Sequence, residues 1–264
     1  MEEAKIGLGD EVIATSFAKG AAARGKRVAF GDGKRYIESP WQRVIFLGNP
    51  NICWPNQIHE PNVEWCSFCK GNRGYNRPDP TGRRRWIWNY SFKAQPGEFF
   101  FASEELQFAS TIKKGFILIE PHVPMHKSCA PNKDWGQKNY QAVADMLLKD
   151  GHEVIQFRHH DYPVLERVMK RDCPSIRYAA AAMRRASVVI TPEGGTHHAA
   201  AAVGQRAVVI FGGFIPPSVI GYDFHTNLTG GVTEACGNLE RCDHCAQALK
   251  AISVEEVYAA AIGK

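Results

Sequence analysis

The chain has 264 residues, of which 44% are hydrophobic and 22% are charged. These proportions are ordinary for a globular protein and exclude a disordered or fibrous chain. The most apolar stretch, residues 207–220, is interrupted by paired glycines and paired prolines and is too short to cross a bilayer. The N-terminus is acidic and lacks the apolar core of a signal peptide. We therefore expect a soluble, cytoplasmic protein, and contact with a membrane surface is left open.

The net charge of +5 is unevenly distributed along the chain. Residues 70–93 contain seven basic residues and one acidic residue, a net charge of +6, so the rest of the chain sums to −1. A generally basic surface for nucleic acid is therefore excluded. The charge pattern instead raises the question of what one local basic segment binds.

The first hundred residues predict a small α/β unit followed by irregular chain. A helix is expected over residues 10–24, after a turn that contains Gly7 and Gly9, and strands are expected over residues 27–30 and 44–47. From residue 49 to 97 the hydrophobic periodicity is lost among Pro, Gly, Trp and Arg residues. Such a stretch indicates long loops or an insertion.

From residue 116 onward, short apolar strands alternate with helices. The expected strands are residues 116–120, 152–157, 187–191 and 206–211, and the expected helices are residues 139–149, 163–171, 176–186 and 196–203. A last helix begins at Ser253, where Ser253 and Glu256 form a capping box. This alternation predicts a parallel sheet with helices on both faces, which is an α/β fold.

A glycine-rich turn between a strand and a helix is the most informative segment for chemistry. It includes Gly194 and Gly195 and precedes an alanine-rich helix. Parallel sheets bind ligands at the carboxyl ends of their strands, and free N–H groups at a helix N-terminus suit a diphosphate. Glycines would let the backbone approach the phosphates closely. The alternative is that these glycines only make the turn.

The same segment, from Glu193 through the helix to the strand that ends in Phe211 and Gly212, resembles the donor-site signature of glycosyltransferase family 9, the ADP-heptose:lipopolysaccharide heptosyltransferases. Four other segments are similar to that family: residues 7–15, Lys133 to Trp135 with Tyr140, residues 151–155, and Cys242-x-x-Cys245 with residues 252–257. The resemblance is good over residues 116–262, modest over residues 5–30 and absent from about residue 50 to 100.

This resemblance implies a GT-B architecture, in which two Rossmann-like domains with parallel sheets face a cleft. Residues 1–114 would form a reduced, acceptor-side domain, and residues 115–264 would form the domain that binds the nucleotide sugar. The implied reaction is inverting transfer of heptose or a related sugar from a nucleoside-diphosphate donor, expected to be an ADP-sugar, to a hydroxyl group. The family typically needs no metal ion, so no cofactor is expected to be required.

The resemblance also implies roles for single residues. Asp10 matches the proposed catalytic base, which would take the acceptor's hydroxyl proton; the alternative is a helix cap. Lys133 matches a lysine that contacts the donor diphosphate; the alternative is a solvated surface lysine. The remaining donor-binding candidates are Glu193, Gly194, Gly195, Thr196 and His197.

Two features of that donor segment need separate interpretation. The family's motif aspartate aligns with Pro192, and the acidic residue follows at Glu193, so Glu193 either substitutes in the site or the contact is lost. His197 either binds a phosphate or packs at the turn. Its neighbour His198 points elsewhere around the helix and is expected to be structural.

The acceptor side is described by weaker signals. Gly9 would let an acceptor approach Asp10, and the basic and aromatic run Arg83, Arg84, Arg85 and Trp86 would hold an anionic acceptor. The alternative is an edge strand whose aromatic residues lie in a core and whose arginines are solvated. A different class of function also stays open, namely a non-catalytic module that binds nucleic acid or another anion, or a transferase that acts on nucleic acid.

Eight cysteines in a cytosolic chain indicate thiols or metal ligands rather than disulfides. Cys53, Cys66 and Cys69 include a CxxC pair and are candidates for a structural zinc site, with ordinary buried or surface thiols as the alternative. A second group contains Cys236, Cys242 and Cys245, with His244 between the last two. The second group looks like family sequence that needs no metal.

Overall fold

The structure is a computed structural model that describes residues 7–125, 127–158 and 163–263. Its N-terminal part contains a long helix, α1 (Leu8–Ala22), followed by strand β1 (Arg27–Phe30). β1 pairs in parallel with β2 (Val63–Cys66), in register from Arg27 opposite Val63. The expected helix and first strand are confirmed, and this parallel pair is a reduced form of a Rossmann-like sheet.

One predicted strand of this part is wrong. Residues 44–47 were expected to be extended, but the chain forms the short helix α2 (Gln42–Ile45) there. Ile45 and Phe46 are buried in the hydrophobic core. A run of four apolar residues satisfies a buried strand and a buried helical turn equally well, so the local pattern did not decide between them.

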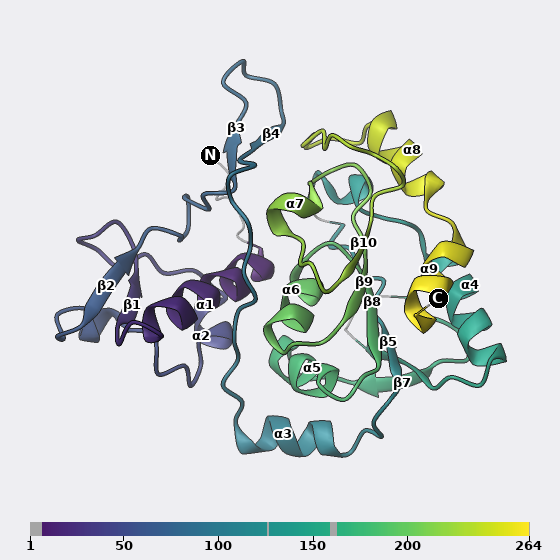
Figure 1. The fold of residues 1–264 in the computed structure, drawn as a ribbon, viewed down its shortest axis with the longest axis horizontal. Coiled ribbons are helices and arrows are strands. Elements are labelled where there is room, and N and C mark those ends of the chain that lie inside the picture. The colour runs from purple at the N-terminus through teal and green to yellow at the C-terminus, as the bar shows by residue number, and fades with distance from the viewer. Residues whose placement is uncertain (1–6, 126, 159–162, 264) are drawn as a thin grey trace.

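The irregular segment has little regular structure, as its composition predicts. It contains a 3₁₀ turn, η1 (Pro55–Gln57), and an antiparallel hairpin made of β3 (Asn76–Pro78) and β4 (Trp86–Trp88). Trp88 is buried, whereas Tyr90 is exposed. The hairpin lies between the N-terminal part and the large sheet (Figure 1).

The C-terminal part is built on a six-stranded sheet in which every pairing is parallel, in the order β10-β9-β8-β5-β6-β7. This sheet confirms the predicted α/β fold. Its strands are β5 (Ile117–Ile119), β6 (Val154–Arg158), β7 (Met169–Asp172), β8 (Val188–Pro192), β9 (Ala207–Ile210) and β10 (Thr226–Leu228).

Helices cover both faces of this sheet. On one face the core includes α4 (Gln137–Lys149) and α9 (Val254–Ile262), and on the other it includes α5 (Ile176–Met183) and α6 (Gly195–Ala202). The remaining elements of this part are η2 (Ala130–Asn132), α7 (Pro217–Ile220) and α8 (Asp243–Ala251). The predicted N-cap is confirmed, because the Ser253 side chain accepts a hydrogen bond from the backbone N–H of Glu256 at 3.0 Å.

A second prediction fails at the edge of the sheet. Residues 163–171 were expected to be a helix, but residues 163–168 are irregular and β7 follows. Arg167 has a positive φ of 61°, which ends helical geometry immediately before the strand. β7 is an edge strand with mostly polar, exposed residues, and a polar stretch of this kind is easily mistaken for the exposed face of a helix.

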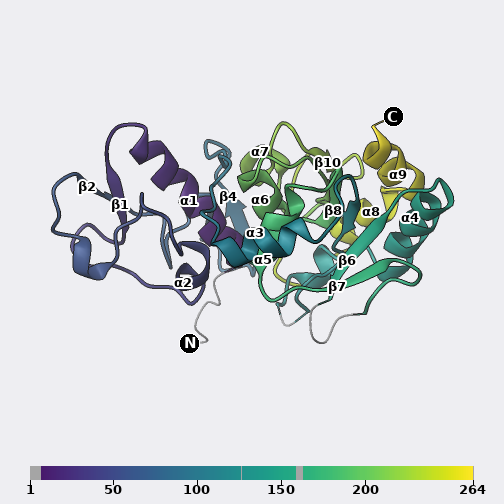
Figure 2. The same cartoon turned by 90° about the horizontal axis from the view of Figure 1, so that it is seen from below.

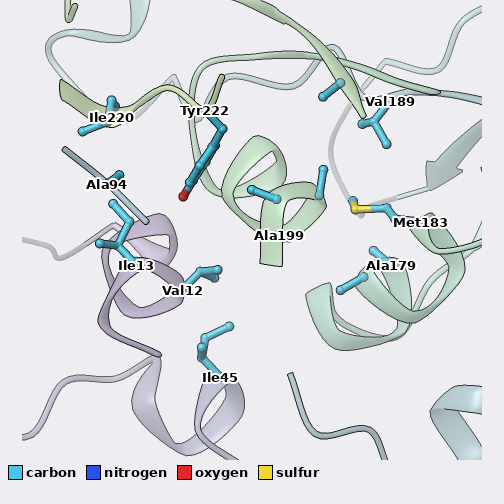
Figure 3. Close-up of a cluster of buried hydrophobic side chains, with 14 of the residues drawn as sticks. Val12, Ile13, Ile45, Ala94, Ala179, Met183, Val189, Ala199, Ile220 and Tyr222 are labelled. Carbon is cyan, nitrogen blue, oxygen red and sulfur yellow. The ribbon is translucent and has the colours of Figure 1, made fainter. Parts of the chain in front are cut away.

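Two helix contacts join the N-terminal part to the large sheet. α1 packs against α6, and α3 (Ser103–Ser110) packs against α5 (Figure 2). Figure 3 shows Val12 and Ile13 of α1 facing Ala199 of α6, with Tyr222 above them. A continuous core therefore runs between the two parts, and the expected division near residue 114 stays a prediction. Within the described residues, no helix combines the length and apolarity needed to span a membrane.

Candidate active site

The site is formed where the N-termini of two helices from different parts of the chain meet. Gly9 at the start of α1 lies against Gly195 at the start of α6: a Cβ on Gly9 would lie 3.3 Å from the Cα of Gly195 and only 2.7 Å from the ring of His198. Gly9 therefore permits a close approach of two backbones. Both helices direct their N–H groups and positive dipole ends towards this region.

Asp10 is held in this region by two donors. Its Oδ1 accepts a hydrogen bond from the Tyr75 hydroxyl at 2.6 Å, and its Oδ2 accepts one from the backbone N–H of Gly7 at 3.2 Å. The Arg73 Nε lies 3.8 Å from the same Oδ2. Asp10 is therefore not the N-cap that the alternative interpretation expects: the N-cap is Gly7, and Asp10 is the third helical residue, whose side chain accepts from the N-cap N–H. Asp10 also belongs to a network that this helix-end contact does not need.

That network continues beneath Asp10. Arg73 donates to Oε1 of Glu11 at 3.0 Å, and the Ser39 hydroxyl donates to the same oxygen at 2.6 Å. The Glu11 side chain is 1% exposed and that of Arg73 is 9% exposed, so this pair is buried. Burial, together with the nearby Asp10 carboxylate, raises the pKa of the Tyr75 hydroxyl well above its usual value. Tyr75 therefore stays protonated and donates to Asp10.

Lys133 and Glu193 form an ion pair on the other side of the site. Lys133 follows η2, and Glu193 follows β8 at the carboxyl end of the strand. Burial alone would lower the pKa of the lysine ammonium, but the Glu193 carboxylate outweighs it, so the pKa of Lys133 lies above its ordinary value. The ammonium also lies 4.8 Å from the centre of the Phe214 ring. Lys133 is therefore a charged, largely enclosed group rather than a solvated one.

The two adjacent histidines are both buried. The His197 Nδ1 accepts a hydrogen bond from the backbone N–H of Gly194 at 2.9 Å, and its Nε2 lies 3.2 Å from the carbonyl oxygen of Ile220. His198 is hydrogen-bonded through Nδ1 to the Tyr222 hydroxyl at 2.8 Å. Burial lowers the pKa of His197 to about 4. The Nδ1 of His197 therefore holds the glycine turn and its Nε2 contacts the end of α7, so the ring packs at the turn, and His198 packs as the sequence predicts.

Gly194, Gly195 and Thr196 are only partly buried at the start of α6. An open pocket lies where the carboxyl ends of β5 and β6 are next to each other, and Asp134, which follows Lys133 in the chain, is one of its lining residues. The pocket is lined by residues that include Glu120, Pro121, Asp134, Gln156 and Phe157. Its place at the ends of parallel strands is the usual location of a nucleotide site in such sheets.

The basic and aromatic run is partly committed to structural contacts. Arg84 pairs with Glu240 at 2.5 Å, Arg85 pairs with Asp79 at 2.5 Å, and Arg83 is exposed. Trp86 is half-buried and packs against the core. The structure therefore joins this run to the large domain, and it does not bring these arginines together as a cluster of free charges.

The cysteines are all free thiols. In the described part of the chain, two sets of three or more ligand-type side chains have donor atoms within 4.8 Å of one another: Cys236 with His244 and Cys245, and Glu193 with His197 and His198. Cys53, Cys66 and Cys69 do not form such a set. The thiols that converge are those of the second group.

Sequence reasoning found Asp10, Lys133 and Glu193 but missed their partners. Tyr75, Arg73 and Ser39 lie in irregular chain between 28 and 65 positions away from the acidic residues that they contact. Arg73 belongs to the basic segment, which was the one available signal for it. Glu11 follows Asp10 directly and is buried inside α1, where a charge requires a partner.

Comparison with known proteins agrees with this architecture. The model of glycosyltransferase family 9 (heptosyltransferase) matches residues 88–222, just over half of the chain. The chain belongs to this family. The Asp10 region lies outside the matched range, and no curated protein sequence matches the chain.

Solved structures show the same fold at low sequence identity. A family 9 glycosyl transferase from Veillonella parvula has a TM-score of 0.61 and 16% identity, over 98% of this chain and 94% of that one. The iron-containing dodecameric glycosyltransferase TibC from enterotoxigenic E. coli has a TM-score of 0.62 and 10% identity, over 98% of this chain and 74% of that one. These similarities establish the GT-B fold.

A third structure shows how the lengths differ. E. coli ADP-heptose lps heptosyltransferase II has a TM-score of 0.47 and 15% identity, over 71% of this chain. The present chain spans 55% of the length of that enzyme.

Proposed function

We propose that this chain is an inverting glycosyltransferase that transfers heptose or a related sugar from an ADP-sugar to a hydroxyl acceptor. The observation that carries the proposal is the meeting of α1 and α6 at Gly9 and Gly195, which places Asp10 of one part within electrostatic range of Lys133 in the Lys133–Glu193 pair of the other. Family membership supports transfer chemistry, and the opposite charges on the two sides of the site supply the groups that it requires.

The chemistry divides between these two sides. The acceptor oxygen attacks the anomeric carbon of the donor from the face opposite the nucleotide. The new carbon–oxygen bond forms as the bond from the anomeric carbon to the phosphate oxygen breaks. Asp10 takes the acceptor's hydroxyl proton, and the nucleoside diphosphate leaves with the electron pair of the broken bond. A single displacement of this kind inverts the configuration of the anomeric carbon.

The donor side meets the charge that develops on the leaving group. Lys133 contributes a cation, and the N–H groups at the start of α6 contribute donors in a partly enclosed site. Gly195 and Thr196, at the half-buried start of α6, leave their N–H groups for phosphate oxygens, whereas the Gly194 N–H donates to the His197 ring. The pocket at the ends of β5 and β6 is suited to the nucleoside.

The donor side is tested first by ligand-induced stabilisation. ADP at about 100 times its Kd should add roughly 2.7 kcal/mol to stability and raise the Tm by about 5–10 °C, whereas UDP, GDP, CDP and dTDP should have weaker effects. A stronger response to another nucleoside diphosphate would overturn the choice of ADP. No response to any of the five would overturn the donor site.

Lys133 is tested by its removal together with the charge of its partner. Lys133→Met should weaken ADP binding by about 10- to 150-fold, the cost of a lost charged hydrogen bond. The double variant Lys133→Met/Glu193→Gln leaves no unpaired buried charge and should remain as weak in binding. The exposed Lys138→Met is the matched control. Equal ADP affinity of the double variant and the wild type would exclude Lys133 from the donor site.

The base is tested by an isosteric change. Asp10→Asn should lower kcat by about 10²- to 10⁴-fold and leave ADP affinity unchanged. The readout is release of nucleoside diphosphate from the stabilising donor in the presence of a panel of hydroxyl acceptors. Exposed Glu104→Gln, in the first turn of α3, is the control. A fully active Asp10→Asn variant would remove Asp10 from the mechanism.

Binding of nucleic acid is the competing interpretation. Arg85 is paired with the buried Asp79 carboxylate and Arg84 with the exposed Glu240, so these two arginines do not form a cluster of free charges. Binding to DNA or RNA that falls steeply with salt, without any response to nucleoside diphosphates, would favour that interpretation instead.

A further inference from the structure

Three cysteines and a histidine converge between β10 and α8, outside the proposed transfer site. The Cys236 Sγ lies 3.3 Å from that of Cys245 and 3.7 Å from that of Cys242. The donor atoms of Cys236, His244 and Cys245 lie within 4.8 Å of one another. Four thiolates around a tetrahedral metal ion with bonds of about 2.3 Å would be separated by about 3.8 Å, so the sulfur positions approach that geometry.

The local structure explains why these side chains converge. Cys242 is the N-cap of α8 and Cys245 lies in its first turn, and residues three apart in a helical turn share one face. Cys236 arrives from the preceding loop, where Gly237 has a φ of +67° and turns the chain back. The helix N-terminus favours the thiolate form that a metal ion requires.

Hydrogen bonds secure the loop around these side chains. The backbone N–H of Asn238 donates to the Cys236 Sγ at 3.4 Å, as N–H groups around metal-bound thiolates commonly do. The buried Asn132 side chain accepts from the N–H of Cys242 at 3.0 Å and donates to the carbonyl oxygens of Asn238 and Glu240. The ring of His244 packs closely on Gly213: a Cβ added to Gly213 would lie 2.7 Å from the His244 ring.

We propose that Cys236, Cys242, His244 and Cys245 bind one transition-metal ion, Zn²⁺ or Fe²⁺, in a structural site. Cys236, His244 and Cys245 already converge, and Cys242, whose Sγ lies 3.7 Å from that of Cys236, would complete a closed donor set of three thiolates and one imidazole. Such sets hold these ions in structural sites and leave no open position for catalysis. The site is distinct from the CxxC at Cys66 and Cys69, whose thiols do not join a third ligand in the described chain.

The position of the site gives the metal ion a definite structural role. The backbone carbonyl of Gly237 accepts a hydrogen bond from the N–H of Trp86, and the N–H of Leu239 donates to the carbonyl of Arg84. The same loop thus holds the β3–β4 hairpin of the N-terminal part (Figure 1). The same loop is also hydrogen-bonded to Asn132, the residue immediately before Lys133. The metal ion would therefore fix the hairpin and the donor-side lysine together.

The test is elemental analysis of the purified full-length chain. We expect about one metal ion per chain, and its identity decides between zinc and iron. His244→Asn and Cys236→Ser should each reduce metal retention against a chelator by at least about tenfold, because even partners outside the ligand set cost that much. Cys173→Ser and the double variant Cys66→Ser/Cys69→Ser are the controls, and they should retain the ion.

Two further readouts do not depend on activity. Protein reconstituted with Co²⁺ should show the visible absorption of a tetrahedral thiolate complex, and this should be lost in His244→Asn and Cys236→Ser. The chelator should lower the Tm of the wild type and leave the Tm of a folded His244→Asn variant unchanged. A metal-free chain that takes up neither Zn²⁺ nor Fe²⁺, or metal retained equally by ligand variants and controls, would overturn the site.

Discussion

The ion pair between Arg177 of α5 and Glu105 of α3 gives the sharpest prediction about how the two parts are held together. Arg177 donates through Nε to Oε1 of Glu105 at 2.5 Å and through Nη2 to Oε2 at 2.8 Å. It also donates to the carbonyl oxygen of Leu47 at 3.0 Å. The side chains of the pair are 3% and 5% exposed. One arginine thus joins three separate segments in an environment without water.

Arg177→Met keeps most of the side-chain volume and leaves the Glu105 carboxylate buried without a cation, while the backbone N–H of Ala102 still donates to it at 2.8 Å. Breaking a buried pair from one side costs about 3–5 kcal/mol. With about 2–4 °C per kcal/mol for a chain of this size, the Tm should fall by roughly 6–20 °C. The double variant Arg177→Met/Glu105→Gln removes the stranded charge and should recover part of this loss.

The assay is urea denaturation at neutral pH, with all four corners of the double-mutant cycle. Arg158→Met is the control, since Arg158 makes a similar bidentate pair with Asp172 at the surface, with 51% and 81% of the side chains exposed. Exposed pairs contribute about 0–1 kcal/mol. If Arg177→Met cost no more than Arg158→Met, the buried pair would not hold the two parts together, and the reasoning would fail.

Three further changes test other parts of the structure. Gly9→Ala places a Cβ 2.7 Å from the ring of His198 and should destabilise the chain by about 1–3 kcal/mol. The control Gly20→Ala, whose Cβ would have its nearest atom at 3.9 Å, should be neutral or stabilising. Equal Tm values of the two variants would contradict the close approach of α1 and α6. Ser253→Ala should cost about 1 kcal/mol in urea denaturation by removing the N-cap of α9, and an unchanged midpoint would show that the cap is not needed. Burial lowers the pKa of His197 from 6.5 to about 4, so as the pH falls the unfolded chain binds this proton before the folded chain does. The contribution of His197 to the free energy of unfolding should therefore be fully present above pH 6.5 and decrease by about 3 kcal/mol by pH 4. A stability that increases over this interval would refute the burial of the neutral ring.

Local pattern was sufficient where neighbouring residues in the sequence decide the structure. Strands β5, β6, β8 and β9 of the large sheet, the helix that follows Ser253 and the glycine turn before α6 follow from periodicity, capping and glycine placement, whereas β10 was not predicted. It was insufficient for residues 44–47 and 163–171. There, a short apolar run and a polar edge strand each allow two structures, and packing against distant chain chooses between them.

The two cysteine groups show the same division. The CxxC spacing occurs at both Cys66 and Cys242, and the sequence favoured the first group, with Cys53, Cys66 and Cys69, as the zinc candidates. Cys66 ends strand β2, where an extended chain separates its side chains, whereas Cys242 begins α8, where one helical turn brings its side chain towards that of Cys245. The same spacing therefore has a different meaning in a strand and in a helix.

The sequence by itself determined the parallel α/β sheet, its helix caps and the identity of Asp10, Lys133 and Glu193 as candidates, because each depends on residues close together in the chain. Only the tertiary structure decided what these candidates contact. Tyr75 reaches Asp10 across 65 positions, and Arg177 reaches Glu105 across 72. A buried charge needs a partner, and tertiary packing, rather than any local pattern, determines which distant residue becomes that partner.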